Sequence, residues 1–194
     1  IKFYYTELSN LPSTLTKLSN LRELSFVSNN FLQIPDVVTK IKTLQKLSFE
    51  GNKIASVPSS IKNLKNLKDL NLSINRIYRL PKSICKLENL ENLYLNRNEL
   101  SELPSQLLNM KNLNYLDISN NDLSKIHIPD LCKNKNQRST LHSLIADNNC
   151  ISEISHSIKN LRNLTRLSLK KNKLQFLPDS ICNLKSLAVL LLTC

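Results

Sequence analysis

The chain has 194 residues, a formal net charge of +12 and a single glycine. One glycine excludes the glycine-rich loops that bind phosphate, and no run approaches the roughly 18 apolar residues of a membrane-spanning helix. The basic excess suggests nucleic acid or an acidic membrane as a partner, so the positions of the charges decide whether that class is accepted.

A unit of 23 residues repeats along the sequence and is clearest from residue 90 to residue 112. Leu93 and Leu95 alternate, which is the spacing of a β-strand, whereas Leu103 and Leu107 recur at the spacing of a helical turn. We number the positions of each unit from its first leucine, so that Leu93 and Leu95 occupy positions 4 and 6. Such a unit cannot bury its apolar face alone and must stack on copies of itself.

The units follow one another without a linker, which predicts one solenoid domain over residues 1–194. A partial unit (1–20) precedes full units that begin at Leu21, Leu44, Leu67, Leu90, Leu113, Leu141 and Leu164, and a shortened unit covers 187–194. Position 9 holds Asn29, Asn52, Asn75, Asn98, Asn121, Asn149 and Asn172, and position 15 holds Pro12, Pro35, Pro58, Pro81, Pro104 and Pro178. The unit that begins at Leu113 carries extra residues within 127–140. We expect a bulge there on the outer side or the edge, either a second contact site or a tolerated insertion.

The repeated positions have a direct physical meaning. Side chains at positions 4 and 6 point to the same side of a strand, so stacked units form a parallel sheet whose inner face is a leucine column. An asparagine at position 9 can bond to the backbone of its own unit and of the neighbouring unit, which satisfies polar groups that a tight coil would bury. Proline fixes φ where the return segment begins. The return segments are short and polar, so we expect turns or 3-10 segments there with little regular α-helix.

The motif LxxLxLxxNxLxxLPxx(I/L)xxLxx resembles the leucine-rich repeat, in the variety that carries Leu-Pro after the asparagine turn, over the whole chain. The resemblance implies an α/β repeat: a leucine-rich-repeat solenoid with a curved parallel β-sheet on the concave face and short turns or 3-10 segments on the convex face. It also implies a module that binds another protein along the concave sheet, without catalysis.

Two groups of leucine-rich repeat proteins share this plain form of the motif. One comprises short repeat proteins of leptospiral bacteria, which are thought to meet host proteins, although their units usually read LPKEIGKLxNL and the glycine is absent here. The other comprises intracellular Ras-associated scaffolds, which imply small-GTPase or phosphatase signalling. Frequent Lys, Asn, Ile and Ser favour the first group. We therefore expect a secreted or cell-surface protein, with a cytoplasmic scaffold as the alternative.

The residues that carry chemistry are not arranged for catalysis or metal binding. The five cysteines are an odd number without paired spacing, which favours a role as buried filler. His127, His142 and His156 show no zinc-ligand spacing, and no serine stands in a recognisable Ser–His–Asp context. The sequence predicts no enzyme, no cofactor, no small-molecule substrate and no metal.

The basic excess avoids the predicted concave face. Positions 2, 3, 5, 7 and 8, which form that face, are nearly balanced, with eight basic and six acidic residues. Most of the net charge therefore lies on the outer turns and edges, for example at Lys40, Lys62, Lys82 and Lys111. A solvated outer coat is favoured over a phosphate-binding surface, so binding of anionic polymer or nucleic acid is the less favoured function.

The concave positions of the middle units carry an unusual set of side chains. Tyr94 and Tyr115 fall in neighbouring units with Asp117 beside them, and neighbouring strands lie about 4.8 Å apart. Tyrosines among carboxylates and amides have the composition of a protein-binding hot spot. The predicted binding residues are Glu50, Asp69, Asn71, Asn92, Tyr94, Asn96, Tyr115, Asp117, Asp147 and Lys170.

The last predicted strand is apolar on both faces. Ala188, Val189 and Leu191 fall on the concave side, while Leu187, Leu190 and Leu192 are expected in the core. A strand of this kind should be covered on both faces, and its outer edge presents unpaired backbone groups. We expect further repeats, a partner, or an edge-to-edge homodimer through 187–194, unless the array simply stops there.

Overall fold

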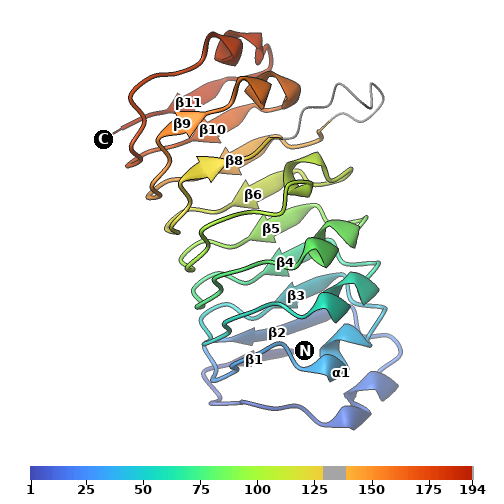
Figure 1. Ribbon diagram of the computed structural model, residues 1–194. Helices are drawn as coiled ribbons and strands as arrows, with labels where there is room; N and C mark the ends of the chain where they lie inside the picture. The colour runs from blue at the N-terminus through green and yellow to red at the C-terminus, as the bar shows by residue number, and fades with distance from the viewer. Residues whose placement is uncertain (129–138, 194) are drawn as a thin grey trace.

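A computed structural model describes residues 1–128 and 139–193 and confirms the predicted solenoid (Figure 1). In this part of the chain, nine strands form one parallel sheet in the order β1-β2-β3-β4-β5-β6-β8-β10-β11. They are β1 (Lys2–Tyr4), β2 (Glu23–Val27), β3 (Lys46–Ser48), β4 (Asp69–Asn71), β5 (Asn92–Tyr94), β6 (Tyr115–Asp117), β8 (Ser143–Ile145), β10 (Arg166–Ser168) and β11 (Val189–Leu191). Each strand lies beside the strand of the next unit, so the sheet runs the length of the stack.

The strand register keeps equal repeat positions opposite one another. Leu47 pairs with Leu70, and Leu70 pairs with Leu93, all at position 4. Position 4 is buried from Leu24 to Leu167, and position 6 is buried from Phe26 to Leu169. A slip of one residue would expose this apolar column, so burial itself specifies the register.

Phenylalanine replaces leucine in the core of the first units. The rings of Phe3 and Phe26 stack at 5.3 Å between centroids, and Phe26 stacks on Phe49 at 5.0 Å. Phe31, at position 11, meets Phe49 edge-on at 5.2 Å. Aromatic rings thus fill the interior there, whereas aliphatic side chains fill it in later units.

The asparagines at position 9 form a hydrogen-bonded column, hereafter the asparagine column, which is buried from Asn29 to Asn149 and half-buried at Asn172. Asn75 Nδ2 donates to the Phe49 carbonyl of the preceding unit at 2.8 Å and to the Leu72 carbonyl of its own unit at 3.1 Å. Its Oδ1 accepts from the Ile54 N–H at 3.0 Å. The same pattern recurs at all seven asparagines of the column, which confirms the predicted role.

The convex side carries 3-10 helices, as predicted, with little α-helix. The segments are η1 (Ser13–Lys17), α1 (Asp36–Thr39), η2 (Ser59–Asn63), η3 (Lys82–Lys86), η4 (Leu107–Asn109), η6 (His156–Asn160) and η7 (Asp179–Asn183). Proline precedes five of them with φ between −62° and −72°, which sets the entry into each turn. Two short strands, β7 (Lys125–Ile126) and β9 (Glu153–Ile154), pair separately from the main sheet.

A left-handed residue follows the strand at position 8, and the sequence analysis missed it. Gly51 has φ 67°, and Ile74, Arg97, Asn120 and Lys171 have φ between 51° and 56°. This conformation turns the chain from the sheet into the asparagine column. Only glycine adopts it without steric cost, so the other units accept backbone strain at this point.

Two expectations need correction. Leu190 and Leu192 do not fill the core: they are 37% and 41% exposed, because β11 has a strand neighbour on one side only in the described residues. Cys182 is exposed and is not buried filler, although Cys85 and Cys150 are half-buried. The predicted bulge falls mainly on 129–138, outside the described residues, as does Cys132.

Candidate functional site on the concave sheet

The predicted site residues form rows across the sheet because the parallel register aligns equal positions. In the row at position 5, Asn71 pairs with Tyr94 and Tyr94 pairs with Asp117. In the row at position 3, Asn92 pairs with Tyr115. All ten predicted residues are half-buried: Glu50, Asp69, Asn71, Asn92, Tyr94, Asn96, Tyr115, Asp117, Asp147 and Lys170. They extend from the end of β3 to the end of β10, so they form an elongated strip.

Tyr94 and Tyr115 are in direct contact at the centre of this strip, and we call them the tyrosine pair. Their ring centroids are 5.1 Å apart and the ring planes are inclined by 38°. The rings meet diagonally because Tyr94 stands at position 5 of β5 and Tyr115 at position 3 of β6. Two adjoining rings offer a large, rigid contact area.

Burial and nearby carboxylates both act on the tyrosine pair. Burial raises the pKa of Tyr94, and the charges of Asp69 and Asp117 raise this pKa further. Burial also raises the pKa of Tyr115, with Asp117 adding to the effect and Arg166 opposing it. The tyrosine hydroxyls therefore lie in a negative field and remain protonated at neutral pH.

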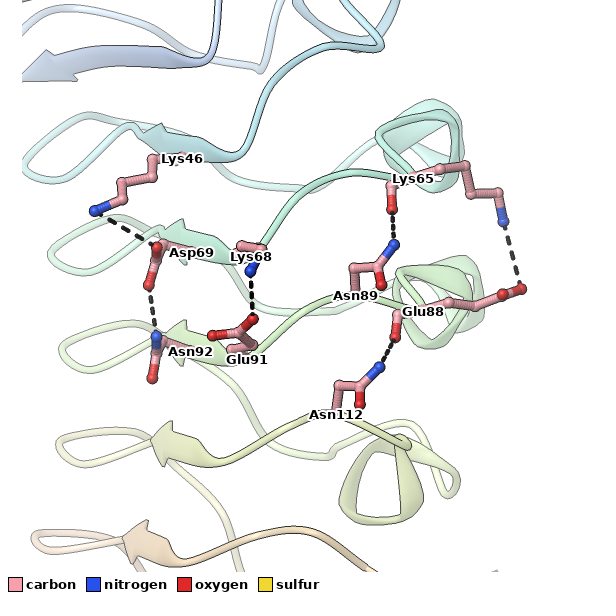
Figure 2. A network of polar contacts seen from close by, with 9 residues as sticks. All are labelled: Lys46, Lys65, Lys68, Asp69, Glu88, Asn89, Glu91, Asn92 and Asn112. Atoms are coloured by element: carbon pink, nitrogen blue, oxygen red, sulfur yellow. Dashed lines mark hydrogen bonds and ion pairs between the residues drawn. The ribbon is translucent and has the colours of Figure 1, made fainter.

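Asp69 and Asp117 are held in different ways. Asp69 accepts a hydrogen bond of 2.6 Å from Asn92 and lies 3.9 Å from the Lys46 ammonium (Figure 2). Asp117 Oδ1 accepts from the backbone N–H and the hydroxyl of Ser119, at 3.0 and 2.7 Å. Within residues 1–128 and 139–193, Asp117 forms no ion pair. Its charge is therefore available to a partner.

Asn71, Glu50 and Asn96 lie toward the first units. Asn71 donates to Glu50 at 2.8 Å and accepts from the Ser73 N–H at 3.0 Å. The Ser73 hydroxyl donates to Asn96 at 2.6 Å. These bonds tie the ends of neighbouring strands together, so part of this polar composition serves the sheet itself.

Asp147 is bound toward the last units and not toward the tyrosine pair. Its Oδ1 accepts from the Ser168 hydroxyl at 2.6 Å and from the Lys170 N–H at 2.8 Å. Lys170 therefore lies one strand beyond Asp147, with its side chain half-buried. The structure thus separates the predicted strip into a centre around the tyrosine pair and an end around Lys170.

Some polar contacts of this face were not predicted. Lys68 and Glu91, both at position 2, form a bond of 2.9 Å, which raises the pKa of Lys68 (Figure 2). Lys46 lies 3.9 Å from both Glu23 and Asp69. Opposite charges at equal positions of neighbouring units are the sequence signal, because the register places them side by side.

Arg166 was also missed as a site residue. It stands at position 3, and Ser143 pairs with both Tyr115 and Arg166, so Arg166 lies two strands from Tyr115 in the same row. Arg166 and Lys171 are exposed and Lys170 is half-buried. We call these three residues the basic end of the concave face.

The convex face combines structural bonds with basic side chains. Asn89 and Asn112 donate to the carbonyls of Lys65 and Glu88, each in the preceding unit, at 2.8 Å (Figure 2). Asn66 donates in the same way to the Lys42 carbonyl at 2.9 Å. An open groove between two units is lined by Lys82, Lys86, Lys111 and Cys85, among others. Burial raises the pKa of Cys85 to about 11, so this thiol stays protonated at neutral pH.

The described residues form neither a metal cluster nor a membrane-spanning helix. No group of three or more His, Cys, Asp or Glu that could hold a metal ion occurs among the described residues. None of the helices in that same part of the chain has the length and apolar character needed to cross a membrane.

Comparison with known proteins supports the architecture. Sequence profiles of the leucine rich repeat match residues 42–100, 112–134 and 163–184, which together make up more than half of the chain. No curated protein matches the chain. Among solved structures, a leucine-rich repeat protein of Leptospira interrogans is similar at 31% identity and a TM-score of 0.76, over 96% of this chain and 52% of that one.

Two further solved structures are similar over nearly all of the described fold. Internalin C2 of Listeria monocytogenes shares 28% identity at a TM-score of 0.80, over 98% of this chain and 78% of that one. The plant peptide hormone receptor RGFR1, in complex with RGF2, shares 27% identity at a TM-score of 0.79, over 99% of this chain and 31% of that one. The chain thus spans about half the length of the Leptospira protein and less than a third of the plant receptor.

Proposed function

The chain belongs to the leucine-rich repeat proteins, and on this premise we propose that it binds a partner protein through its concave sheet, with the tyrosine pair at the centre of the contact. The observation that carries the proposal is the direct contact of Tyr94 and Tyr115 beside Asp117, a carboxylate without an ion pair among the described residues. Aromatic side chains that are half-buried on a sheet face gain most when a partner covers them completely.

The proposed location is outside the cell or at its surface, and the proposed partner is a host protein met by a bacterial protein. Likeness to the Leptospira protein, to internalin C2 and to a plant peptide hormone receptor supports this over the alternative, a cytoplasmic scaffold of small-GTPase or phosphatase signalling. The purified domain should retain a protein from a host surface extract. Retention from a cytosolic extract alone would favour the scaffold instead.

Alanine substitution of the central residues tests the proposed site. Tyr94→Ala, Tyr115→Ala and Asp117→Ala together should weaken binding of the retained partner by about 1–4 kcal/mol, because a few central residues carry most interface energy. The midpoint of urea unfolding should fall only slightly: the three side chains lie outside the leucine core, although Asp117→Ala removes the acceptor of the buried Ser119 N–H and hydroxyl. Tyr78→Ala with Asp122→Ala is the matched control, because both residues are exposed at positions outside the strand rows. Normal binding by the triple variant would refute the concave site.

The convex lysines support a second candidate, the binding of an anionic polymer. The groove lined by Lys82, Lys86 and Lys111 favours this candidate. Affinity for duplex DNA or heparin should then fall log-linearly with salt. The protein-binding proposal expects only weak retention on such polymers at physiological salt. Tight, sequence-selective binding above roughly 0.2 M salt would favour the polymer instead.

We also propose that β11 brings two copies of the chain together edge to edge. Leu190, Leu192 and Phe176 are exposed at this end, and Leu192 and Phe176 line a shared groove. Sedimentation at micromolar concentration should show dimers, and Val189→Lys with Leu191→Lys should convert them to monomers. Monomers of the unaltered chain throughout that range would exclude self-association.

A further inference from the structure

A negative region and a basic region lie two strands apart on the concave face. Around the tyrosine pair the field is negative, because Asp69 and Asp117 lie beside Tyr94 and Asp117 makes no ion pair within the described residues. The basic end follows two strands later in the sheet order β6-β8-β10. Its Arg166, Lys170 and Lys171 likewise form no ion pair in residues 1–128 and 139–193. They outnumber Asp147, the carboxylate that lies beside them and accepts from the Ser168 hydroxyl and the Lys170 N–H.

The central site has the chemistry to hold a cationic side chain. A guanidinium or ammonium group gains from the face of an aromatic ring and from a carboxylate that can accept its N–H donors. The adjoining rings of Tyr94 and Tyr115 supply the aromatic surface, and Asp117 is held with its Oδ1 on Ser119. The second carboxylate oxygen of Asp117 accepts no hydrogen bond from the described residues and can receive the partner.

The distance between the two regions sets the spacing of the partner's charges. Two strand steps of about 4.8 Å separate β6 from β10 by about 10 Å. An extended chain in the polyproline-II conformation advances about 9 Å in three residues and returns to the same face. Ile145 is half-buried in β8, between Asp117 and Ser168 in the same row, and offers apolar contact to the residues between the two charges.

We propose that the concave face recognises an extended partner segment with an arginine or lysine over Tyr94, Tyr115 and Asp117, and with an aspartate or glutamate three residues away over the basic end. The inference rests on the proposed function and adds the chemistry of the partner to it. It commits to one order of charges along the sheet, cationic at the centre and anionic toward β10.

Synthetic peptides test the spacing directly. The probes are blocked peptides of about twelve residues in a proline- and alanine-rich background that favours polyproline II, with one Arg and one Glu separated by zero to five residues in both orders. Fluorescence anisotropy should show the tightest binding at the spacing Arg-x-x-Glu in one of the two orders. The advantage over the other spacings should be about tenfold. A flat dependence on spacing, or no binding by any peptide, overturns the inference.

Substitutions in the protein assign each charge to its site. Asp117→Asn keeps an oxygen for Ser119 and should weaken the best peptide about tenfold, yet leave a peptide whose Arg is replaced by Ala unaffected. The double variant Lys170→Gln with Arg166→Gln should also weaken the best peptide about tenfold, yet leave a peptide whose Glu is replaced by Ala unaffected. Asp122→Asn and Lys159→Gln, which are exposed outside these rows, are the matched controls. Equal losses for both peptides in each variant would contradict the assignment.

The two proposals fail in different ways. If the triple variant at Tyr94, Tyr115 and Asp117 loses its natural partner while the peptides show no preferred spacing, the concave site stands and the charge pattern is wrong. If the triple variant binds its natural partner normally, the concave site is wrong. The charge pattern then falls with it.

Discussion

The asparagine column and the rows of the concave face both consist of polar side chains, but the column is uniform along the solenoid and the rows vary. Both consist of polar side chains that bond between neighbouring units, as Asn75 does inside and Asn92 does on the sheet. The column is buried from Asn29 to Asn149 and has one residue type with one bonding pattern, whereas the concave rows are half-exposed and change from unit to unit. A buried polar group cannot form a hydrogen bond to water, so each one must find a partner within the protein. Asparagine meets this requirement at every unit of the column. Water satisfies the groups on the face, which leaves the face free to vary.

Removing one amide from each region should separate them most clearly. Asn75→Ala should lower the free energy of unfolding by about 2–4 kcal/mol, because it leaves the buried Ile54 N–H without its acceptor. Asn71→Ala, in the same unit but half-exposed, should cost less than about 1 kcal/mol, since water can replace Glu50 and Ser73. Urea unfolding of the two variants measures both values. Equal losses would show that the concave amides are structural as well.

Position 8 joins the two regions, and Gly51 there is sensitive to a side chain. Gly51→Ala should destabilise the protein by about 1–2 kcal/mol, because alanine pays for the left-handed conformation at φ 67°. The added Cβ would also lie 3.0 Å from the Ser28 hydroxyl and 3.3 Å from the Ser28 nitrogen. Ser28 has φ 55° itself, so Ser28→Gly alone is the reference: Gly51→Ala should cost less in the Ser28→Gly background than in the unaltered chain if part of the loss comes from crowding against the Ser28 hydroxyl. No loss in the single variant would show that the turn adapts.

Ile74 occupies the same turn with a β-branched side chain at φ 56°. Ile74→Asn should raise the free energy of unfolding by up to about 1 kcal/mol, because asparagine tolerates this conformation much better. Ile74 is 42% exposed, so little apolar burial is lost. Ile74→Val is the control that keeps the β-branch. A lower free energy of unfolding for Ile74→Asn would mean that the Ile74 side chain makes stabilising contacts with the concave face.

The finest test of the face is the ionisation of its tyrosines. Asp117→Asn should lower the pKa of both Tyr94 and Tyr115, whereas Asp69→Asn should lower that of Tyr94 only. Ultraviolet titration of each variant, with Tyr94→Phe and Tyr115→Phe to assign the two groups, measures these shifts. A pKa raised by folding means that the tyrosines add stability below the unfolded pKa of about 10, and that this stability is lost as pH rises through the folded pKa. Tyr94→Phe should therefore make the decline of stability above about pH 10 less steep.

The fold follows from residues that recur because burial constrains them. Leu93, Asn98 and Pro104 each predict a contact that their counterparts repeat, so the sheet, the asparagine column and the convex 3-10 helices could all be expected. The left-handed residue at position 8 could not be expected in the same way. Gly51 and Asn120 suggest it, but Ile74 and Arg97 are exposed and are retained in spite of backbone strain, which leaves no common residue type to recognise.

The candidate site could be predicted only as far as the rows themselves. Counting positions places Tyr94 near Tyr115 and Asp117, because neighbouring strands stand at a fixed distance. It does not tell how each carboxylate is bonded: Asp147 Oδ1 accepts from the Ser168 hydroxyl and the Lys170 backbone N–H of the next unit, whereas Asp117 Oδ1 accepts from Ser119 of its own unit. Arg166 was missed since its influence on Tyr115 reaches across two strands and depends on side-chain conformation.

The direction of bonding in the asparagine column bears on how such a chain can grow. Each asparagine gives its amide to the unit before it and accepts an N–H from that same unit, as Asn98 does with Leu72 and Ile77. The buried N–H and carbonyl groups of each unit are thus paired by the asparagine of the next unit. Duplicating or deleting a whole unit of 23 residues preserves these hydrogen bonds between neighbouring units. An insertion or deletion between the strand and the asparagine would instead break the bonds that this asparagine forms with the preceding unit. The long unit accordingly keeps its strand and Asn121 in register and adds its extra residues later. The hydrogen bonding therefore favours the gain or loss of whole repeat units, and the exposed side chains of the concave rows can then change independently in each copy.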